Sequence, residues 1–284
     1  MLRSILVGLD GSQYSKSAID VGIYLARKTG ALLVGLGVVD EPTIREAEPR
    51  LLGGGVPYAE PVLYRERIAN ARREVEQFLG QFSQRCAEAG VPFKVLEDVG
   101  VPHEQIESEA QRYDLILLGQ QTRFHFETQE GYDDTVRRVL KNSPRPVIAV
   151  PANLQMNPDD PGHTVLVAYD GSLQSARSLH AFRTSGIAGI VPMIVATVHP
   201  ERIRAAQIAE RAIDYLRFHE IKAEAMAVGS SASPAQVLLD TAQKHKSALI
   251  VMGGYGQPVL REFFLGSVTR SLLAQSPVPL FLYH

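Results

Sequence analysis

The amino-acid sequence predicts an α/β protein made of two tandem, doubly wound domains, each with a five-stranded parallel sheet. The first observation is an internal repeat, in which three segments recur later in the chain in the same order. The pairs are SILVGLDGSQYSKSA (4–18) with TVLVAYDGSLQSARS (164–178), DLILLGQ (114–120) with ALIVMGG (248–254), and NSPRPVIAV (142–150) with QSPVPLFLY (275–283). The second observation is that short β-branched runs alternate with amphipathic stretches. These runs are largely apolar on both faces, as is typical of parallel strands covered by helices on both sides.

The repeat also predicts the domain organisation. We expect a first domain over residues 1–150, a linker over 151–162 and a second domain over 163–284. The linker, PANLQMNPDDPG, is dense in turn-forming residues. The first copy carries extra residues in its middle, which include the Gly- and Pro-rich segment REAEPRLLGGGVPYAEP (45–61).

The individual elements follow from the alternating patterns within each copy. In the second copy, strands are predicted near 164–169, 191–198, 222–228, 248–253 and 279–283. Helices are predicted near 173–185, 201–220, 234–246 and 267–275. The first copy has the same order, with a long second helix near 64–89.

Composition narrows the classes of function. Hydrophobic residues make up 45% of the chain and charged residues 21%, which is typical of a soluble globular protein. The net charge of −2 gives no global basic field for nucleic acid or a membrane surface, and no apolar run approaches the roughly 20 residues of a membrane span. The single cysteine, Cys86, suits a reducing compartment and is expected to fill space on a helix. We therefore expect a cytoplasmic protein with no nucleic acid or membrane partner.

Glycine-rich turns mark the expected ligand site of the second copy. In an open α/β sheet, ligands bind beyond the carboxyl ends of the strands, where the strand order reverses. The turn YDGS (169–172) follows the first strand and GGYG (253–256) follows the fourth. Glycines there permit positive φ and a close approach of backbone N–H groups to a ligand. Gly266 and Ser267 open the last helix, whose N-terminus favours an anion, so these features together predict a phosphate cradle.

The spacing Gly253-x2-Gly256-x9-Gly266-Ser267 resembles the nucleotide-binding signature of the universal stress protein family. The Asp-Gly-Ser after the first strand and the closing Ser-Pro-x-Pro strand resemble that family as well, so the resemblance covers nearly the whole chain as two tandem domains. It implies a Rossmann-like, adenine nucleotide α-hydrolase-like fold. It also implies that the ligand is ATP or another adenine nucleotide, often with a divalent metal such as Mg²⁺ or Mn²⁺.

The resemblance also implies roles for single residues. Asp170 matches the family's acidic residue near the nucleoside, and Val198 matches its residue beside the adenine. The matching phosphate-binding positions are Gly253, Gly256, Gly266 and Ser267. Arg261, in the loop between the glycines, is placed to reach a β- or γ-phosphate as a charged donor.

A simpler structural interpretation of these residues stays open. Asp170 can form an Asx turn or cap the helix that follows. Val198 can be a core residue, and Ser267 can be only an N-cap. Arg261, which precedes a glutamate, can be an ordinary surface residue.

The first copy departs from the signature in GQQTRFHFETQEGYDDTVRRVL (119–140). Only the first glycine, Gly119, is retained. Thr122 takes the place of Gly256, and Asp134 aligns with Gly266, where a carboxylate would repel a phosphate. We therefore expect that the first domain does not bind ATP in the family manner.

Other polar residues of the first copy are expected to have structural roles. Asp10, after the first strand, is interpreted as a turn residue. His103 and His125 have no His or Cys at ligand spacing, so they are interpreted as loop or surface residues.

The leading functional hypothesis is a nucleotide-binding stress-response protein that uses ATP as a regulatory ligand. The sequence shows no Walker lysine, and no motif singles out a Ser-His-Asp or paired-carboxylate arrangement. A slow ATPase or nucleotidyl enzyme, or an interaction module with idle sites, remains the alternative.

The two domains are expected to pack against each other. The predicted fifth strands, 145–150 and 278–283, are apolar and end their domains, and an exposed apolar edge strand invites association. We therefore expect an intramolecular pseudo-dimer through these strands, with two domains on a flexible tether as the alternative. A further homodimer and an unknown protein partner are also compatible with the sequence.

Overall fold

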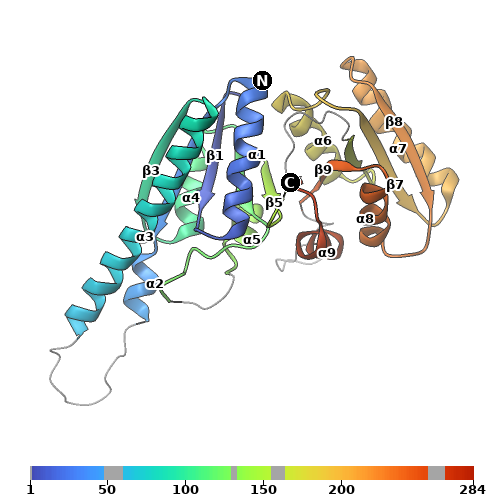
Figure 1. Ribbon diagram of the computed structural model, residues 1–284. Helices are drawn as coiled ribbons and strands as arrows, with labels where there is room; N and C mark the ends of the chain where they lie inside the picture. Colours follow the sequence, from blue (N-terminus) through green and yellow to red (C-terminus); the bar gives the residue numbers. More distant parts are fainter. Residues whose placement is uncertain (1, 48–59, 129–132, 155–163, 255–265) are drawn as a thin grey trace, which may run out of the picture.

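The computed structural model of the chain describes residues 2–47, 60–128, 133–154, 164–254 and 266–284. Strands and helices alternate through both halves (Figure 1). The first half contains β1 (Ser4–Leu9), α1 (Gln13–Thr29), β2 (Leu32–Val39), α2 (Glu41–Glu46), α3 (Glu60–Ala89), β3 (Phe93–Val99), α4 (Pro102–Ala110), β4 (Leu115–Gly119), α5 (Thr135–Asn142) and β5 (Val147–Val150). The second half contains β6 (Thr164–Ala168), α6 (Leu173–Ser185), β7 (Met193–His199), α7 (Arg202–Phe218), β8 (Ala223–Gly229), α8 (Pro234–Lys244), β9 (Ser247–Gly253), α9 (Ser267–Gln275) and β10 (Leu280–Tyr283).

The strands form one sheet in the order β3-β2-β1-β4-β5-β10-β9-β6-β7-β8. Within each half, the named strands pair in parallel. The strand order reverses between β1 and β4 in the first half, and between β6 and β9 in the second. The predicted fold class, with two doubly wound parallel sheets, is therefore confirmed, and the carboxyl ends at these two reversals are the expected ligand positions.

Each half begins its first helix in the same way. Ser12 and Ser172 cap α1 and α6, and each side chain accepts the backbone N–H three residues ahead at 3.2 Å. The turn before each cap contains a left-handed glycine, Gly11 (φ +72°) or Gly171 (φ +78°), a conformation that other residues rarely adopt. The repeated Asp-Gly-Ser sequence thus produces the same strand–turn–helix corner twice.

Two hydrophobic clusters lie on the two faces of the sheet. One contains side chains of α1, α3, α6 and α7, and the other contains side chains of α4, α5, α8 and α9. Cys86 of α3 is fully buried in the first cluster, and this burial raises the pKa of its thiol to about 11, in keeping with a space-filling role. Within the described ranges, no helix is both long and apolar enough to cross a bilayer.

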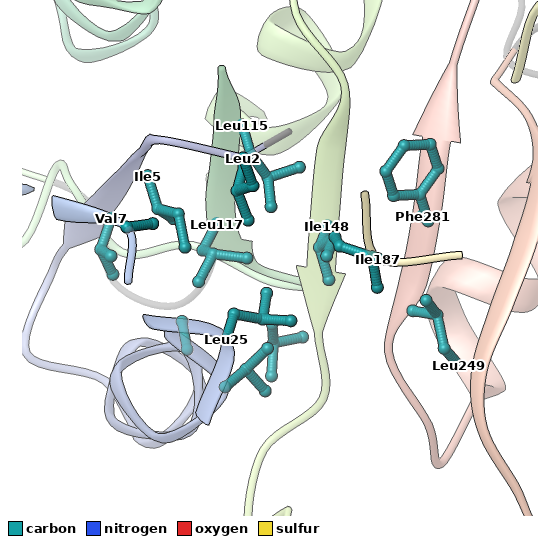
Figure 2. Close-up of a cluster of buried hydrophobic side chains, with 14 of the residues drawn as sticks. Leu2, Ile5, Val7, Leu25, Leu115, Leu117, Ile148, Ile187, Leu249 and Phe281 are labelled. Atoms are coloured by element: carbon teal, nitrogen blue, oxygen red, sulfur yellow. The ribbon is translucent and has the colours of Figure 1, made fainter. Parts of the chain in front are cut away.

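The two halves are joined by antiparallel pairing of β5 with β10. Ile148 pairs with Phe281, and both side chains are at most 1% exposed within the cluster that Figure 2 shows. Across the junction, Gln120 Nε2 donates to the carbonyl oxygens of Ser276 (3.2 Å) and Val278 (3.4 Å). The structure therefore has the intramolecular pairing through the fifth strands that the sequence predicts.

Replacing Ile148 with lysine should break this junction. A lysine there would bury a charge without a partner, so we expect the free energy of unfolding to fall by about 3–5 kcal/mol. Urea unfolding measures this loss, and small-angle scattering should show a less compact particle. Gln111→Lys, at an exposed position, is the control. A compact Ile148→Lys protein of unchanged stability would contradict this role of the junction.

Candidate functional site

A cavity of about 270 Å³ lies beyond the carboxyl ends of β6 and β9, where the strand order of the second half reverses. Its walls come from β6, β7, β9 and the first residues of α6, α8 and α9. Among the lining residues are five that the sequence predicts as site residues: Asp170, Val198, Gly253, Gly266 and Ser267. The other two predicted residues, Gly256 and Arg261, lie outside the described residues. The positions of the five thus fit a single crevice.

Asp170 holds the turn at one side of this cavity. Its Oδ1 accepts the backbone N–H of Ser172 at 2.9 Å, so the Asx-turn interpretation is correct. Thr197 of β7 also stabilises this turn, because its Oγ1 donates a hydrogen bond to the carbonyl oxygen of Tyr169 at 2.6 Å. Asp170 itself is exposed, and its carboxylate lines the cavity. The turn therefore orients a carboxylate that can also accept hydrogen bonds from a ligand.

The floor of the cavity is apolar. Val198 is half-buried and lies there beside Ala168, Ala196, Leu238 and Met252. Val198 also packs against the buried cluster on that face, so its core role and its position in the cavity occur together. Small side chains on β6 and β7 leave room for a flat apolar group.

Gly253 is required by packing rather than by its backbone angles. The sequence led us to expect that the glycine turns permit positive φ, and Gly171 has it (φ +78°), but Gly253 does not. A Cβ on Gly253 would lie 2.9 Å from Cβ of Gln174 and 3.0 Å from the backbone nitrogen of Ser175. The missing side chain lets the start of α6 approach the end of β9.

The start of α9 faces the cavity with backbone donors. Gly266 is the N-cap residue, so Ser267 is the first helical residue, and the interpretation of Ser267 as an N-cap is wrong. Because a glycine cap offers no side-chain acceptor, the first N–H groups of α9 receive no hydrogen-bond acceptor from the side chain of their cap residue. A helix N-terminus in this condition is suited to an anion.

The first half contains a different arrangement at the equivalent place. The strand registers and the repeat match four residues of the first half with four that line the cavity of the second half. The pairs are Gly8 with Ala168, Val38 with Val198, Ile106 with Leu238, and Leu118 with Met252. Phe124 lies among these residues and is 1% exposed. This side chain comes from the loop between β4 and α5, and no motif in the sequence singled it out.

Asp134 and Gly266 are the N-cap residues of α5 and α9, as the sequence alignment predicts. The last turns of the two helices also match, since Ser143 N donates to Val139 O and Ser276 N donates to Leu272 O, both at 2.8 Å. Because α9 is one residue longer than α5, counting back from these turns brings Asp133 level with Gly266. The start of α5 therefore has two neighbouring carboxylates, Asp133 and Asp134, where α9 has a glycine.

His125 is also more buried than the sequence predicts. It lies in a loop as expected, but its side chain is 14% exposed, and its Nδ1 hydrogen-bonds to Oδ2 of Asp40, which is 3% exposed. This hydrogen bond raises the pKa of His125, burial opposes the shift, and the charges of Asp40, Asp133 and Asp134 add to the increase. The hydrogen bond between His125 and Asp40 therefore fastens the loop to the N-cap of α2.

Introducing a methyl group at Gly253 should disturb the crevice. We expect Gly253→Ala to lower the free energy of unfolding by about 1–3 kcal/mol, because the Cβ meets backbone atoms of α6. Gly254→Ala is the matched control, since its nearest atom would be the Tyr283 carbonyl oxygen at 3.5 Å, an ordinary contact. Equal unfolding curves in urea for the two variants would contradict this packing role.

The His125–Asp40 pair predicts a pH dependence of stability. Because the folded pKa of His125 is raised, its contribution should be fully present below about pH 6.5, the ordinary histidine pKa, and be lost as pH rises through the folded value. The difference in Tm between the wild type and His125→Gln should thus shrink from pH 6 to pH 9. In an Asp40→Asn background the difference should depend far less on pH. A difference that grows with pH would have the wrong sign.

Together, the fold and the crevice define a tandem, doubly wound α/β protein with a candidate ligand site at the switch point of its second half. Comparison with known protein families shows to which family the chain belongs. The chain belongs to the universal stress protein family, whose model matches residues 1–151 and 162–284.

Relatives and solved structures agree with this assignment. Universal stress protein Slr1230 of Synechocystis is 22% identical over 296 residues, which cover 99% of this chain and all of that protein. The crystal structure of a universal stress protein from Archaeoglobus fulgidus matches 98% of this chain and 97% of its own, with a TM-score of 0.71 and 20% identity, and so shows the fold. A family member from Arabidopsis thaliana, whose structure contains AMP, covers 56% of this chain with a TM-score of 0.37 and 16% identity.

Proposed function

We propose that the second domain binds one adenine nucleotide, with ATP as the leading candidate, and that its occupancy is a regulatory signal. The observation that carries this proposal is a cavity that combines an apolar floor, Asp170 and the glycine-capped start of α9. Its volume of about 270 Å³ is close to the lower end of small-molecule pockets, roughly 300–1,000 Å³. The described walls therefore suit the nucleoside end of a nucleotide.

Each part of the ligand has a proposed partner. The base lies on the floor beside Val198, and a ribose hydroxyl donates to Asp170. The phosphates lie at the start of α9, and the proposed phosphate-binding residues are Gly253, Gly256, Gly266, Ser267 and Arg261. These roles agree with the chemistry of the walls, because an apolar floor suits a flat base and a helix N-terminus suits an anion.

A divalent metal fits this site only as a partner of the nucleotide. Among the described residues, no group of three His, Cys, Asp or Glu side chains is placed to hold a metal ion. Mg²⁺ often keeps several waters and binds through phosphates and one or two carboxylates. We therefore propose that Mg²⁺ or Mn²⁺, where present, enters with the phosphates.

The proposal divides the chain into functionally unequal parts. Residues 1–150 form a domain that does not bind nucleotide in the family manner, 151–162 form the linker, and 163–284 form the binding domain. The joined sheet keeps these domains together as an intramolecular pseudo-dimer. A cytoplasmic location suits this function and suits the buried, unreactive Cys86.

Replacing Gly266 with aspartate should abolish nucleotide binding. Aspartate is a good N-cap, so α9 should still form, but its carboxylate would oppose a phosphate and weaken ATP binding by at least about 100-fold. Calorimetry with ATP or AMP, with and without MgCl₂ or MnCl₂, measures this. Ser271→Asp is the matched control, because it adds the same charge to the same helix one turn further on, and its affinity should change little.

The same titration tests the proposal as a whole. We expect one site per chain and no sustained release of ADP on product analysis. Two equivalent sites, the absence of binding with metal present, or full affinity in a folded Gly266→Asp protein would contradict the proposal. Sustained ADP release that is lost in the variant would indicate an enzyme.

A further inference from the structure

The loop between β4 and α5 occupies the crevice of the first domain. We propose that Phe124 and Asp133 are a built-in substitute for the base and the phosphate of a nucleotide. The comparison with a nucleotide rests on the function proposed for the second domain. The described residues support this proposal at three separate points of the crevice.

The first point is the floor, where the second domain is open. Phe124 packs among Val38, Ile106 and Leu118, the counterparts of residues that line the cavity of the second domain. Gly8 on β1 makes room for Leu118 and Phe124, because a methyl group at that position would clash with Cδ2 of Leu118 and lie 3.1 Å from Cζ of Phe124. The second domain has Ala168 there and a cavity above it. A flat aromatic ring thus fills the place proposed for a base.

The second point is the helix start. Asp133 directly precedes the N-cap residue Asp134, and its carboxylate accepts the backbone N–H of Thr135, the first residue of α5, at 2.9 Å. It also accepts the backbone N–H of Phe124 at 2.6 Å and the hydroxyl of Thr122. Backbone donors of a loop and of a helix N-terminus are the groups that typically surround a phosphate. Here the chain supplies the acidic group itself.

The third point is the carboxyl group after the first strand. Asp10 is 5% exposed, and its two oxygens accept the backbone N–H of Ser12 (3.0 Å) and of Arg123 (2.7 Å). In the second domain, the equivalent Asp170 is exposed and accepts from Ser172. In the second domain, we proposed that the Asp170 carboxylate accepts a hydrogen bond from a ribose hydroxyl. In the first domain, the equivalent carboxylate of Asp10 accepts one from the loop, through the backbone N–H of Arg123.

Two outer contacts hold the loop over the crevice. His125 bonds to Asp40, and Phe126 packs edge-to-face on Phe78 of α3, with ring centroids 5.9 Å apart. The loop thus supplies a ring and a carboxylate and engages Asp10, so the first domain is held in an occupied form. The chain thus combines one exchangeable site with one that is permanently filled.

Cavity complementation tests the central contact. Phe124→Ala should open a site for a flat aromatic molecule, and adenine is the probe. Amide hydrogen exchange of β1 and β2 reports on the first domain alone. We expect adenine to slow this exchange in Phe124→Ala by a factor of 1 + [adenine]/Kd, about tenfold at ten times Kd.

Phe126→Ala is the matched control, because it removes an aromatic ring from the outer side of the same loop. Adenine should leave exchange of β1 and β2 unchanged in this variant and in the wild type. Failure to slow exchange in Phe124→Ala, or an equal effect in all three proteins, would overturn the proposal.

A second measurement needs no cavity, and so remains decisive if Phe124→Ala does not fold. In the wild type, the amides of Arg123, Phe124 and Thr135 should be protected from exchange, with or without ATP. Asp133→Asn should increase exchange at Phe124 and Thr135 at least tenfold and leave Arg123 less affected. Unprotected amides in the wild type would mean that the loop does not occupy the crevice. Both measurements are independent of ATP binding to the second domain, so failure of the proposed function would be recognised separately.

Discussion

The antiparallel pairing of β5 with β10 is the interaction on which the rest of the structure depends. Each is a strand of four residues at the end of its parallel sheet, and each alone would expose backbone groups and apolar side chains. Paired, they bury Ile148 and Phe281 and join ten strands into one sheet. Both switch points lie close to this junction, because β4 adjoins β5 and β9 adjoins β10. The same pairing therefore fixes the two crevices relative to each other.

One scaffold gives two different crevices because a few residues decide how the loop after the fourth strand is used. The corner after the first strand is the same in both domains, with an aspartate, a left-handed glycine and a capping serine. The difference is at the floor, where Gly8 admits the ring of Phe124 and Ala168 leaves a cavity. A second difference lies at the start of the last helix of each domain, where Asp133 provides a carboxylate before α5 and Gly266 provides none before α9. The common corner is thus compatible with an open or a filled site.

The fold could be predicted from sequence because its signals are local and repeated. Alternating apolar runs and the duplicated segments predict the strands, and element ends in the second half differ from the prediction by no more than two residues. The positions of Asp170, Val198 and Gly253 around one crevice also follow from strand order. The burial of Phe124 could not be predicted, because it depends on space left by Gly8, distant in sequence. The role of Asp133 could not be predicted either, because it depends on hydrogen bonds from Thr122 and Phe124, which lie about ten residues earlier in the chain.

The helix α9 connects the candidate site to the junction between domains. Its first residues line the crevice of the second domain, while Arg270, Leu273 and Ala274 line a cavity of about 540 Å³ whose opposite wall includes Asp133 and Asp134. Asp133 is held there by hydrogen bonds from Phe124 and Thr135, so that wall belongs to the filled crevice of the first domain. The first residues of α9 therefore border the candidate site, and its later residues border the wall that the loop of the first domain forms.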